Sequence, residues 1–449
     1  MDDIQQKLGK LGIEIPEILL PQRMNLQQWA VIACDQFTQD RAYWEKVREA
    51  ADGQPSALNL ILPEVFLADD DRAGRIENIH RAMRNYLANG VFADPHRGFV
   101  YLERDTPFNC GRRGLVVAVD LEQYDWSPSA RPLIRSTEDT VPDRLPPRME
   151  IRRNVPLETP HILLLIDDDD DSLLRGLGKR AHKTAPAYQG DLMLNSGNVS
   201  GWFLDTPDDW AFLAGGLEEL VHRSLTRYSA AGQPFLFAVG DGNHSLASAK
   251  GIWEEYKATY GGGESVPVHP CRYALVEIEN IYDPAIQFEP IHRVVFGLGF
   301  NETLKLLSAL PDFSSQIVAT GEDLVRLTAE PANGSRFGII SGNCYALVTT
   351  SAGGPAGGIA TVSLQPLLDQ AVGGALSIDY IHGEDELFRL ASGSDTANSG
   401  PVTGILLPPV QKHGFFETVA RSGPMPRKSF SMGEAAEKRF YIECRKLFG

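Results

Sequence analysis

Cysteine and basic residues are scarce in this sequence, and each shortage excludes a class of protein. The five cysteines stand singly among 449 residues, so neither a disulfide framework nor a cysteine-rich zinc site is expected. Lysine and arginine total 42 against 59 acidic residues, which gives a formal charge of -17. Such a charge repels a phosphate backbone, and DNA or RNA is therefore not expected as a partner.

Long apolar runs are also missing. No segment approaches the roughly 18 consecutive apolar residues that a membrane helix needs, and the acidic start MDDIQQKLGK lacks the pattern of a signal peptide. We therefore expect a cytoplasmic protein without membrane contact. A hydrophobic content of 43% with 22% charged residues is typical of a globular chain, and the length predicts two or three domains. The oligomeric state is left open.

Several catalytic motifs are absent as well. The sequence contains no GxxxxGK[ST], HExxH or GxSxG motif, and no GxGxxG follows a predicted strand. His382 and Glu384 have the HxE spacing of nucleobase deaminases, but no PCxxC follows them. Phosphate handling without a P-loop is the small-molecule chemistry that these absences leave open.

Short apolar runs alternate with segments of helical periodicity, which predicts mixed α and β structure. Strands are expected at Trp29–Ala33, Gly98–Leu102, Leu115–Asp120, His161–Ile166, Phe235–Val239, Tyr273–Ile278, Phe337–Ile340, Tyr345–Thr350 and Gly404–Leu407. Helices are expected at Arg41–Ala51, Arg75–Ala88, Asp208–Tyr228, Ser245–Tyr260, Glu302–Ala309, Leu364–Val372, Glu384–Leu390 and Glu434–Leu447.

A change of texture after about Phe296 predicts the domain organisation. We expect a catalytic domain over 1–296, a smaller α+β domain over 297–410, and a helical tail over 411–449. The tail is expected to close on the candidate site of the catalytic domain, which is described next. The glycine-rich stretches 261–264 and 353–358 predict loops.

The segment Phe235–Lys250, FLFAVGDGNHSLASAK, is the main candidate for chemistry. Its apolar run stops at a glycine-flanked aspartate, Asp241, where a tight turn leads into a helix. The free N–H groups of that helix form an anion site, with His244 within reach of a phosphate oxygen. A plain turn with an Asn or Ser cap and a satisfied histidine is the competing interpretation. The other polar or close-approach positions of this turn are Gly240, Gly242, Asn243 and Ser245.

Two further segments are rich in groups that bind anions. In the first, Arg135–Arg153, arginines surround Glu138, which they would hold ionised as a base or metal ligand. In the second, GPMPRKSFS, prolines stiffen the chain before Lys428 and Ser429. A surface salt-bridge network and a plain loop remain the respective alternatives.

The acidic run 167–171 is a weaker candidate. Five consecutive aspartates suggest a cation site, but adjacent carboxylates need not converge on one ion, and a solvated loop at a helix start is the favoured interpretation.

Four pieces of the sequence, in order over most of the chain, resemble the domain of unknown function 1015 family: IRSTEDTVPDRLPPR, AVGDGNHSLASAK, PIHRVV and MPRKSFSMGEAAEKRF. In that family the turn usually reads DGHHR and the C-terminal motif MPxKST. Asn243 replaces the first histidine of that turn and Ser245 replaces its arginine. The DGHHR turn is similar to the signature of the ParB and sulfiredoxin-like fold, whose superfamily includes kinases that phosphorylate free L-serine.

The resemblance implies an α+β fold, with a ParB/sulfiredoxin-like core carrying insertions and a smaller C-terminal α+β domain. It also implies a magnesium-dependent phosphotransferase acting on a small hydroxylated metabolite, with L-serine the leading candidate and ATP, ADP or pyrophosphate as donor. Asp241 would bind Mg²⁺ or accept the hydroxyl proton, His244 would hold phosphate, and Glu138 would be the acidic partner and second metal ligand. The further phosphate contacts would be Gly240, Gly242, Asn243, Ser245, Arg135, Lys428 and Ser429.

Two other functions stay open on the same residues. One is a non-catalytic nucleotide or metabolite sensor, and the other is a phosphohydrolase that directs the same carboxylates onto water.

Overall fold

The computed structural model describes residues 2–228, 233–260, 266–332, 334–351, 360–372, 376–392 and 400–448. The chain divides into two compact units. The larger unit comprises Met1–Ile286 together with Gly433–Gly449, and the smaller unit comprises Gln287–Met432. Each unit has its own sheet and its own hydrophobic core. The predicted glycine-rich loops at 261–264 and 353–358 lie outside the described residues.

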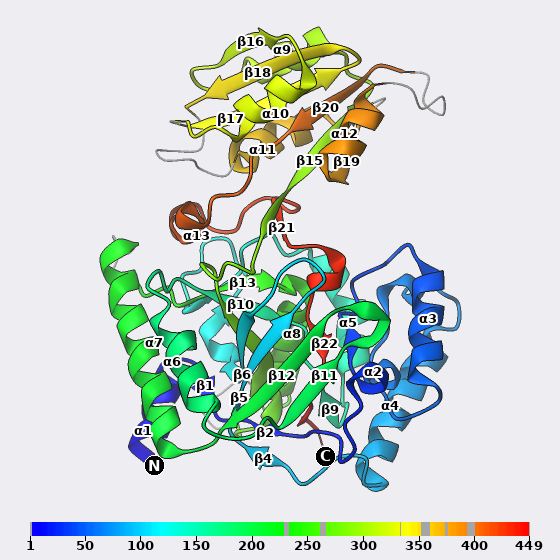
Figure 1. Cartoon of the computed structure of the whole chain (residues 1–449), viewed down its shortest axis with the longest axis vertical. Coiled ribbons are helices and arrows are strands. Elements are labelled where there is room, and N and C mark those ends of the chain that lie inside the picture. The colour runs from blue at the N-terminus through cyan, green and yellow to red at the C-terminus, as the bar shows by residue number, and fades with distance from the viewer. Residues whose placement is uncertain are drawn as a thin grey trace. The chain divides into compact units, whose positions relative to one another are not determined.

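A mixed sheet organises the larger unit (Figure 1). Among the described residues its strands lie in the order β11 (Tyr188–Asp191), β12 (Asn198–Leu204), β5 (Phe99–Asp105), β6 (Arg112–Asp120), β14 (Tyr273–Asn280), β10 (Leu163–Ile166), β13 (Phe237–Asp241), β8 (Ile134–Arg135) and β7 (Tyr124–Asp125), with β1 (Ile13–Glu14) paired to β6. β10 runs parallel to β14 and antiparallel to β13, whereas β13 and β8 are parallel.

β6 shows why the middle of this sheet is buried. Its β-branched sequence RRGLVVAVD is buried from Leu115 to Val119 on both faces, which is the pattern of a central strand. Gly114 makes room for a neighbour, because a Cβ there would lie 2.0 Å from Oε1 of Glu277 on β14. The glycine therefore allows a carboxylate to be buried in the sheet.

Helices cover the sheet and flank it (Figure 1). They are α1 (Asp2–Lys10), α2 (Leu26–Trp29), α3 (Arg41–Ala51), α4 (Arg72–Ala88), α5 (Leu145–Arg152), α6 (Ser172–Ala181), α7 (Pro207–Arg227) and α8 (Asn243–Ala258). α7 begins with a complete capping box in which Thr206 and Asp209 satisfy each other's backbone N–H groups. No helix within the described ranges is both long and apolar enough to cross a membrane.

The C-terminal segment returns to the larger unit in extended conformation. β22 (Phe440–Tyr441) pairs with β3 (Val31–Ile32), and β23 (Arg445–Lys446) pairs with β9 (Leu157–Glu158). A third short ladder joins β2 (Glu17–Ile18) to β4 (His96–Arg97).

The predicted helix Glu434–Leu447 is therefore wrong. The segment contains only a short 3-10 turn, Ala435–Glu437, before the strands. Arg439 to Cys444 are all at most 3% exposed, so both faces of the chain are buried. The charged residues of this segment pair with buried partners: Arg439 contacts Glu277 and Glu443, and Arg445 contacts Glu158.

The smaller unit is a sheet between two layers of helices. The strands described there lie in the order β16 (Ser314–Val318), β18 (Cys344–Thr350), β17 (Ser335–Ser341), β20 (Val402–Leu406), β15 (Phe288–Phe296) and β19 (Ser377–His382), with β21 (Phe430–Met432) paired to β15. The helices are α9 (Phe300–Leu307), α10 (Gly321–Ala329), α11 (Thr361–Ala371), α12 (Glu384–Ala391) and α13 (Phe415–Ser422).

Strand alternation builds two cores in this unit. Val295 and Ile339 pack with α9 and α11 on one face, whereas Val294 and Ile340 pack with α10 and α12 on the other. His292, which precedes these valines in PIHRVV, is 1% exposed, and its Nδ1 accepts the N–H of Leu407 at 3.1 Å. This contact fits a structural role for the histidine.

The unit boundaries differ from the predicted domain boundaries. β15 begins at Phe288 and pairs with β19, β20 and β21, so the smaller unit starts at Gln287 instead of 297. The predicted tail 411–449 is divided, because its residues up to Met432 belong to the smaller unit and those from Gly433 to the larger unit.

Arg439→Met should destabilise the larger unit by about 3–5 kcal/mol, because it leaves Glu277 and Glu443 buried without their cation. All six tryptophans lie within residues 29–253, so the free energy of unfolding of this unit can be measured by tryptophan fluorescence in denaturant. The matched control is Arg153→Gln, which removes an exposed partner of Glu255 and should cost about 0–1 kcal/mol. Equal effects of the two variants would contradict the role given to Arg439.

Candidate functional site

The glycine turn has the geometry that its sequence predicts. β13 ends at Asp241, Gly242 adopts φ +82°, and α8 begins at Asn243. The dihedral angle favours glycine, and a Cβ at Gly242 would also make a tight contact, 3.2 Å from Cα of Ile162, the residue before β10. The first backbone bond of the helix joins the N–H of Leu246 to the carbonyl of Gly242. The N–H groups before Leu246 therefore have no partner within the helix and point out of its positive end.

Asp241 lies beside this helix terminus and is paired with a lysine. Its Oδ2 is 3.3 Å from Nζ of Lys438, and its Oδ1 accepts the N–H of Gly242 at 2.9 Å. Lys438 comes from the C-terminal segment, so the cation and the carboxylate are brought together by the fold and not by sequence proximity. Sequence reasoning missed Lys438, since EKRF was interpreted as part of a helix.

His244 is held as a neutral imidazole. Its Nε2 accepts the backbone N–H of Val141 at 3.3 Å, which leaves Nδ1 as the protonated nitrogen. Burial, followed by the nearby Arg148 and Arg144 guanidinium groups, lowers the pKa of His244 from 6.5 to about 4. His244 can therefore donate one hydrogen bond at neutral pH without carrying a charge.

The structure brings the Arg135 segment to the same turn. β8 lies next to β13, Thr137 donates its hydroxyl to the carbonyl of Val239 at 2.5 Å, and Ser136 Oγ lies 2.6 Å from Oδ1 of Asn243. Ser136 also contacts the carbonyl of Glu138 at 2.8 Å, and the side chain of Glu138 is half-buried. Glu138 thus belongs to the segment docked on the turn, and its acidic role stays a prediction.

Arg135 itself is engaged elsewhere. It is buried, it donates to the carbonyls of Pro132 and Pro234, and its guanidinium lies 4.4 Å from the ring centroid of Phe235. These contacts hold the start of β13. To bind a phosphate as predicted, the Arg135 guanidinium would have to break these contacts.

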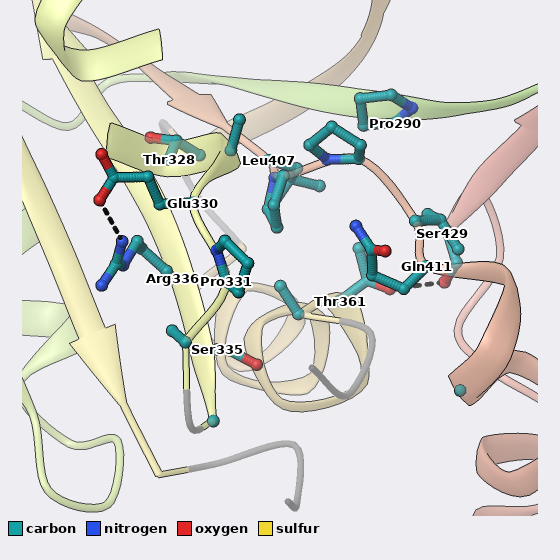
Figure 2. A pocket seen from close by; sticks show the side chains of 18 of the residues that line it. Pro290, Thr328, Glu330, Pro331, Ser335, Arg336, Thr361, Leu407, Gln411 and Ser429 are labelled. Atoms are coloured by element: carbon teal, nitrogen blue, oxygen red, sulfur yellow. Dashed lines mark hydrogen bonds and ion pairs between the residues drawn. The ribbon is translucent and has the colours of Figure 1, made fainter. Parts of the chain in front are cut away.

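Lys428 and Ser429 belong to the smaller unit, whereas the glycine turn belongs to the larger unit. Ser429 is buried, donates its hydroxyl to the carbonyl of Pro426 at 2.6 Å and accepts the hydroxyl of Thr361 at 2.7 Å. It lines a cavity of about 520 Å³ within that unit, together with Thr361, Pro290 and the end of α10 (Figure 2). The roles predicted for Lys428 and Ser429 at the turn stay predictions.

A smaller cavity of about 130 Å³ adjoins the first turn of α8. Ser245 lines it, and its Oγ lies 2.9 Å from Nε2 of His161, whose Nδ1 lies 2.6 Å from the hydroxyl of Tyr441. Sequence reasoning missed His161 and Tyr441. His161 was assigned to the start of the predicted strand His161–Ile166, and Tyr441 lies in the segment that was interpreted as a helix, so neither residue stood out as a functional group.

The acidic run 167–171 is neutralised by arginines. Arg223 and Arg227 of α7 pair with its first carboxylates, and Arg113 pairs with Asp171, the residue before α6. The buried Asp168 accepts the N–H of Leu173 at 2.8 Å. The run therefore lies in a loop that leads into a helix, as favoured from the sequence, with Asp169 and Asp170 exposed and paired with arginines.

Magnesium is the metal implied by the resemblance. Within the described ranges no group of three or more His, Cys, Asp or Glu side chains is placed to hold a metal ion. Magnesium in phosphoryl-transfer sites is commonly held by one or two carboxylates plus waters and substrate phosphates. Asp241 could therefore coordinate a magnesium ion that is already bound to the phosphates of the donor. The turn does not supply enough ligands to bind magnesium alone.

A family model described as "Protein of unknown function (DUF1015)" matches residues 18–371, which is well over half of the chain. This protein belongs to that family. The match includes the turn and the Arg135 segment, whereas MPRKSFS and Lys438 lie beyond its end. No curated protein matches the sequence.

Several solved structures resemble this DUF1015 protein. A conserved hypothetical protein from Pyrococcus furiosus shares 11% identity over 74% of this chain and 95% of its own, with a TM-score of 0.35. A free serine kinase in complex with AMP shares 12% identity over 73% and 90%, with a TM-score of 0.35. SbnI with C-terminal truncation from Staphylococcus aureus shares 13% over 73% and 82%, with a TM-score of 0.32. These scores are too low to establish the fold or the activity of this chain.

The low pKa of His244 has a consequence for stability. In the unfolded chain the histidine binds a proton near its ordinary pKa of 6.5, whereas in the folded chain it binds one only near 4. Its contribution to stability is therefore present above about pH 6.5 and is lost as the pH falls through about 4. In His244→Gln, whose amide oxygen can accept the N–H of Val141, this part of the acid destabilisation should disappear.

The measurement is unfolding of the larger unit by tryptophan fluorescence between pH 4 and 7, combined with NMR titration of the ring nitrogens. A His244 signal that titrates near 6.5 would contradict the neutral imidazole. Burial also lowers the pKa of His292 to about 4. His292 lies in the smaller unit, which contains no tryptophan, so its titration should not contribute to the fluorescence signal of the larger unit.

Proposed function

We propose that the turn between β13 and α8 is the centre of a magnesium-dependent phosphotransferase that acts on a small hydroxylated metabolite, with L-serine as the first acceptor to test. The phosphoryl donor would be ATP, ADP or pyrophosphate. The mixed sheet around the turn would be the ParB/sulfiredoxin-like core of the larger unit.

One observation carries the proposal: a carboxylate, an ammonium group and the free end of a helix lie at the same glycine turn. Asp241 and Lys438 are 3.3 Å apart, and the N–H groups of α8 before Leu246 point out beside them. Phosphoryl transfer needs mainly positioning and stabilisation of charge on phosphate oxygens, for which this combination is suited.

Each group has a distinct task in this proposal. The helix N–H groups and Lys438 would bind phosphate oxygens, and the neutral His244 would donate a further hydrogen bond through Nδ1. Asp241 would hold the magnesium ion or accept the proton of the acceptor hydroxyl. When bound, magnesium would neutralise part of the charge on the phosphates.

Asp241→Asn should lower kcat by roughly 10²-fold or more, because it removes the carboxylate and nearly preserves the side-chain shape. Turnover is measured by mass spectrometry of phosphorylated product with each donor against L-serine and related hydroxy compounds. Asp191→Asn, an exposed position on the edge strand β11, is the matched control. Retained turnover in Asp241→Asn would exclude the assigned role.

The same assay separates the other two functions. Nucleotide binding without any product would favour the sensor, and release of inorganic phosphate without an acceptor would favour the phosphohydrolase.

Magnesium should bind only together with the donor. Titration calorimetry with MgCl₂ alone should give no saturable signal, because Asp241 contributes one carboxylate that is already paired with Lys438. The affinity for ADP or ATP should rise when magnesium is added, and this gain should be absent in Asp241→Asn. Tight magnesium binding without a donor would indicate a preformed metal site elsewhere.

A further inference from the structure

Ser245 and His161 have the arrangement of a nucleophile and its base. Ser245 Oγ lies 2.9 Å from Nε2 of His161, and the other ring nitrogen lies 2.6 Å from the hydroxyl of Tyr441. His161 is 8% exposed and Tyr441 is 2% exposed, so packing fixes the orientation of the imidazole. A hydroxyl, a base within hydrogen-bond reach and a third group that orients the base are the elements of nucleophilic catalysis by serine.

Charge and space around the pair suit this chemistry. Oδ2 of Asp35 is 4.0 Å from Nε2 of His161, where it would stabilise the imidazolium that forms when the histidine takes a proton. Ser245 and His161 both line the cavity of about 130 Å³, whose walls combine apolar side chains with two ion pairs, Arg148 with Glu64 and Arg152 with Glu158. A small acceptor bound in this cavity would lie next to the serine oxygen.

The position of Ser245 in the helix favours a phosphoryl group over other adducts. Ser245 is the third residue of α8, within the turn whose N–H groups lack helical partners. A phosphoserine carries about -1.5 to -2 charges, and the first turn of a helix is where such a charge is stabilised best. The helix terminus that would bind the donor phosphate would thus also hold the phosphorylated serine.

We infer that the phosphoryl group passes through Ser245, so that the reaction is a double displacement; this inference rests on the proposed phosphotransferase. In the first step Ser245 Oγ attacks the terminal phosphorus of a phosphoric anhydride donor, and its proton goes to Nε2 of His161. The new Oγ–P bond forms as the bond from phosphorus to the leaving phosphate oxygen breaks. In the second step the acceptor hydroxyl attacks the same phosphorus, and its proton goes to solvent or Asp241. The Oγ–P bond breaks as the bond from the acceptor oxygen to phosphorus forms, and His161 returns its proton to the leaving Ser245 oxygen.

The test is to incubate the full chain with magnesium and ATP, ADP or pyrophosphate in turn, without an acceptor. Intact-mass spectrometry should detect one added phosphoryl group, and peptide mapping should locate it on Ser245. Adding the acceptor that supports turnover should discharge the label at a rate no slower than turnover.

Three variants make the result specific. Ser245→Ala should abolish both the label and turnover, and His161→Gln should slow labelling by roughly 10²-fold. Ser363→Ala is the matched control, since Ser363 is the third residue of α11 but its hydroxyl contacts the carbonyl of Ala360 and no histidine. The Ser363 variant should keep the label. Tryptophan fluorescence checks that the Ser245 and His161 variants are folded, and circular dichroism does so for Ser363→Ala, whose unit contains no tryptophan.

The outcomes separate the two proposals. Turnover without a label, with Ser245→Ala still active, would overturn the covalent step and leave the phosphotransferase standing. A label on another residue that persists in Ser245→Ala would also overturn it. Absence of transfer from every donor in the unaltered protein would remove the proposed function and this inference together.

Discussion

Arg439 lies buried between the carboxylates of Glu277 and Glu443, and it also donates to the carbonyl of Pro160 at 3.0 Å. A charge taken out of water is tolerated only when such partners surround it. These contacts fix the register of the C-terminal segment in the larger unit, and Gly114 leaves the space that Glu277 needs. The candidate site depends on these contacts, because the residues next to Arg439 in the sequence supply two of the side chains of the site.

Lys438 precedes Arg439 and Tyr441 follows it by two residues, so both side chains are placed once the arginine is fixed. Lys438 reaches Asp241, and Tyr441 reaches His161. Asp241 and Ser245 are positioned independently by the glycine turn. The site thus combines two parts of the chain. The glycine turn between β13 and α8 is specified by its local sequence, whereas the C-terminal segment is brought to it only by the fold.

The same division explains how much could be predicted. The turn, the start of α8 and the mixed α and β character follow from local patterns of glycine, apolar runs and helical periodicity, and the structure contains all three. Glu434–Leu447 is extended instead of helical because it pairs with β3 and β9 and its charged residues find buried partners, which are long-range contacts that local patterns do not show. Lys438 and Tyr441 were missed for the same reason, and His161 was assigned to the start of the predicted strand His161–Ile166 without a functional role.

Arg135 illustrates a second limit. Its position next to the turn follows from the pairing of β8 with β13, yet its guanidinium points to the carbonyls of Pro132 and Pro234 and to the ring of Phe235. Sequence patterns place a residue in an element, but they do not select which of several acceptors a long side chain will contact. Neither the nearness of Arg135 to the turn nor its partners followed from local patterns, because β8 was not among the predicted strands and its pairing with β13 joins distant parts of the chain.

The turn carries little net charge of its own, since Asp241 offsets Lys438 and His244 is neutral. In the family's usual DGHHR turn an arginine occupies the position of Ser245, and that cation is missing here. In the proposed function, a phosphate at this turn would be held by directed N–H and hydroxyl donors, by Lys438 and by a metal ion that accompanies the phosphate, with the Arg144 and Arg148 guanidinium groups near His244. Directed hydrogen bonds act only at short range, whereas a net charge acts over about a Debye length. The exchange of arginine for serine therefore replaces long-range attraction with a hydroxyl that faces the cavity and contacts a base.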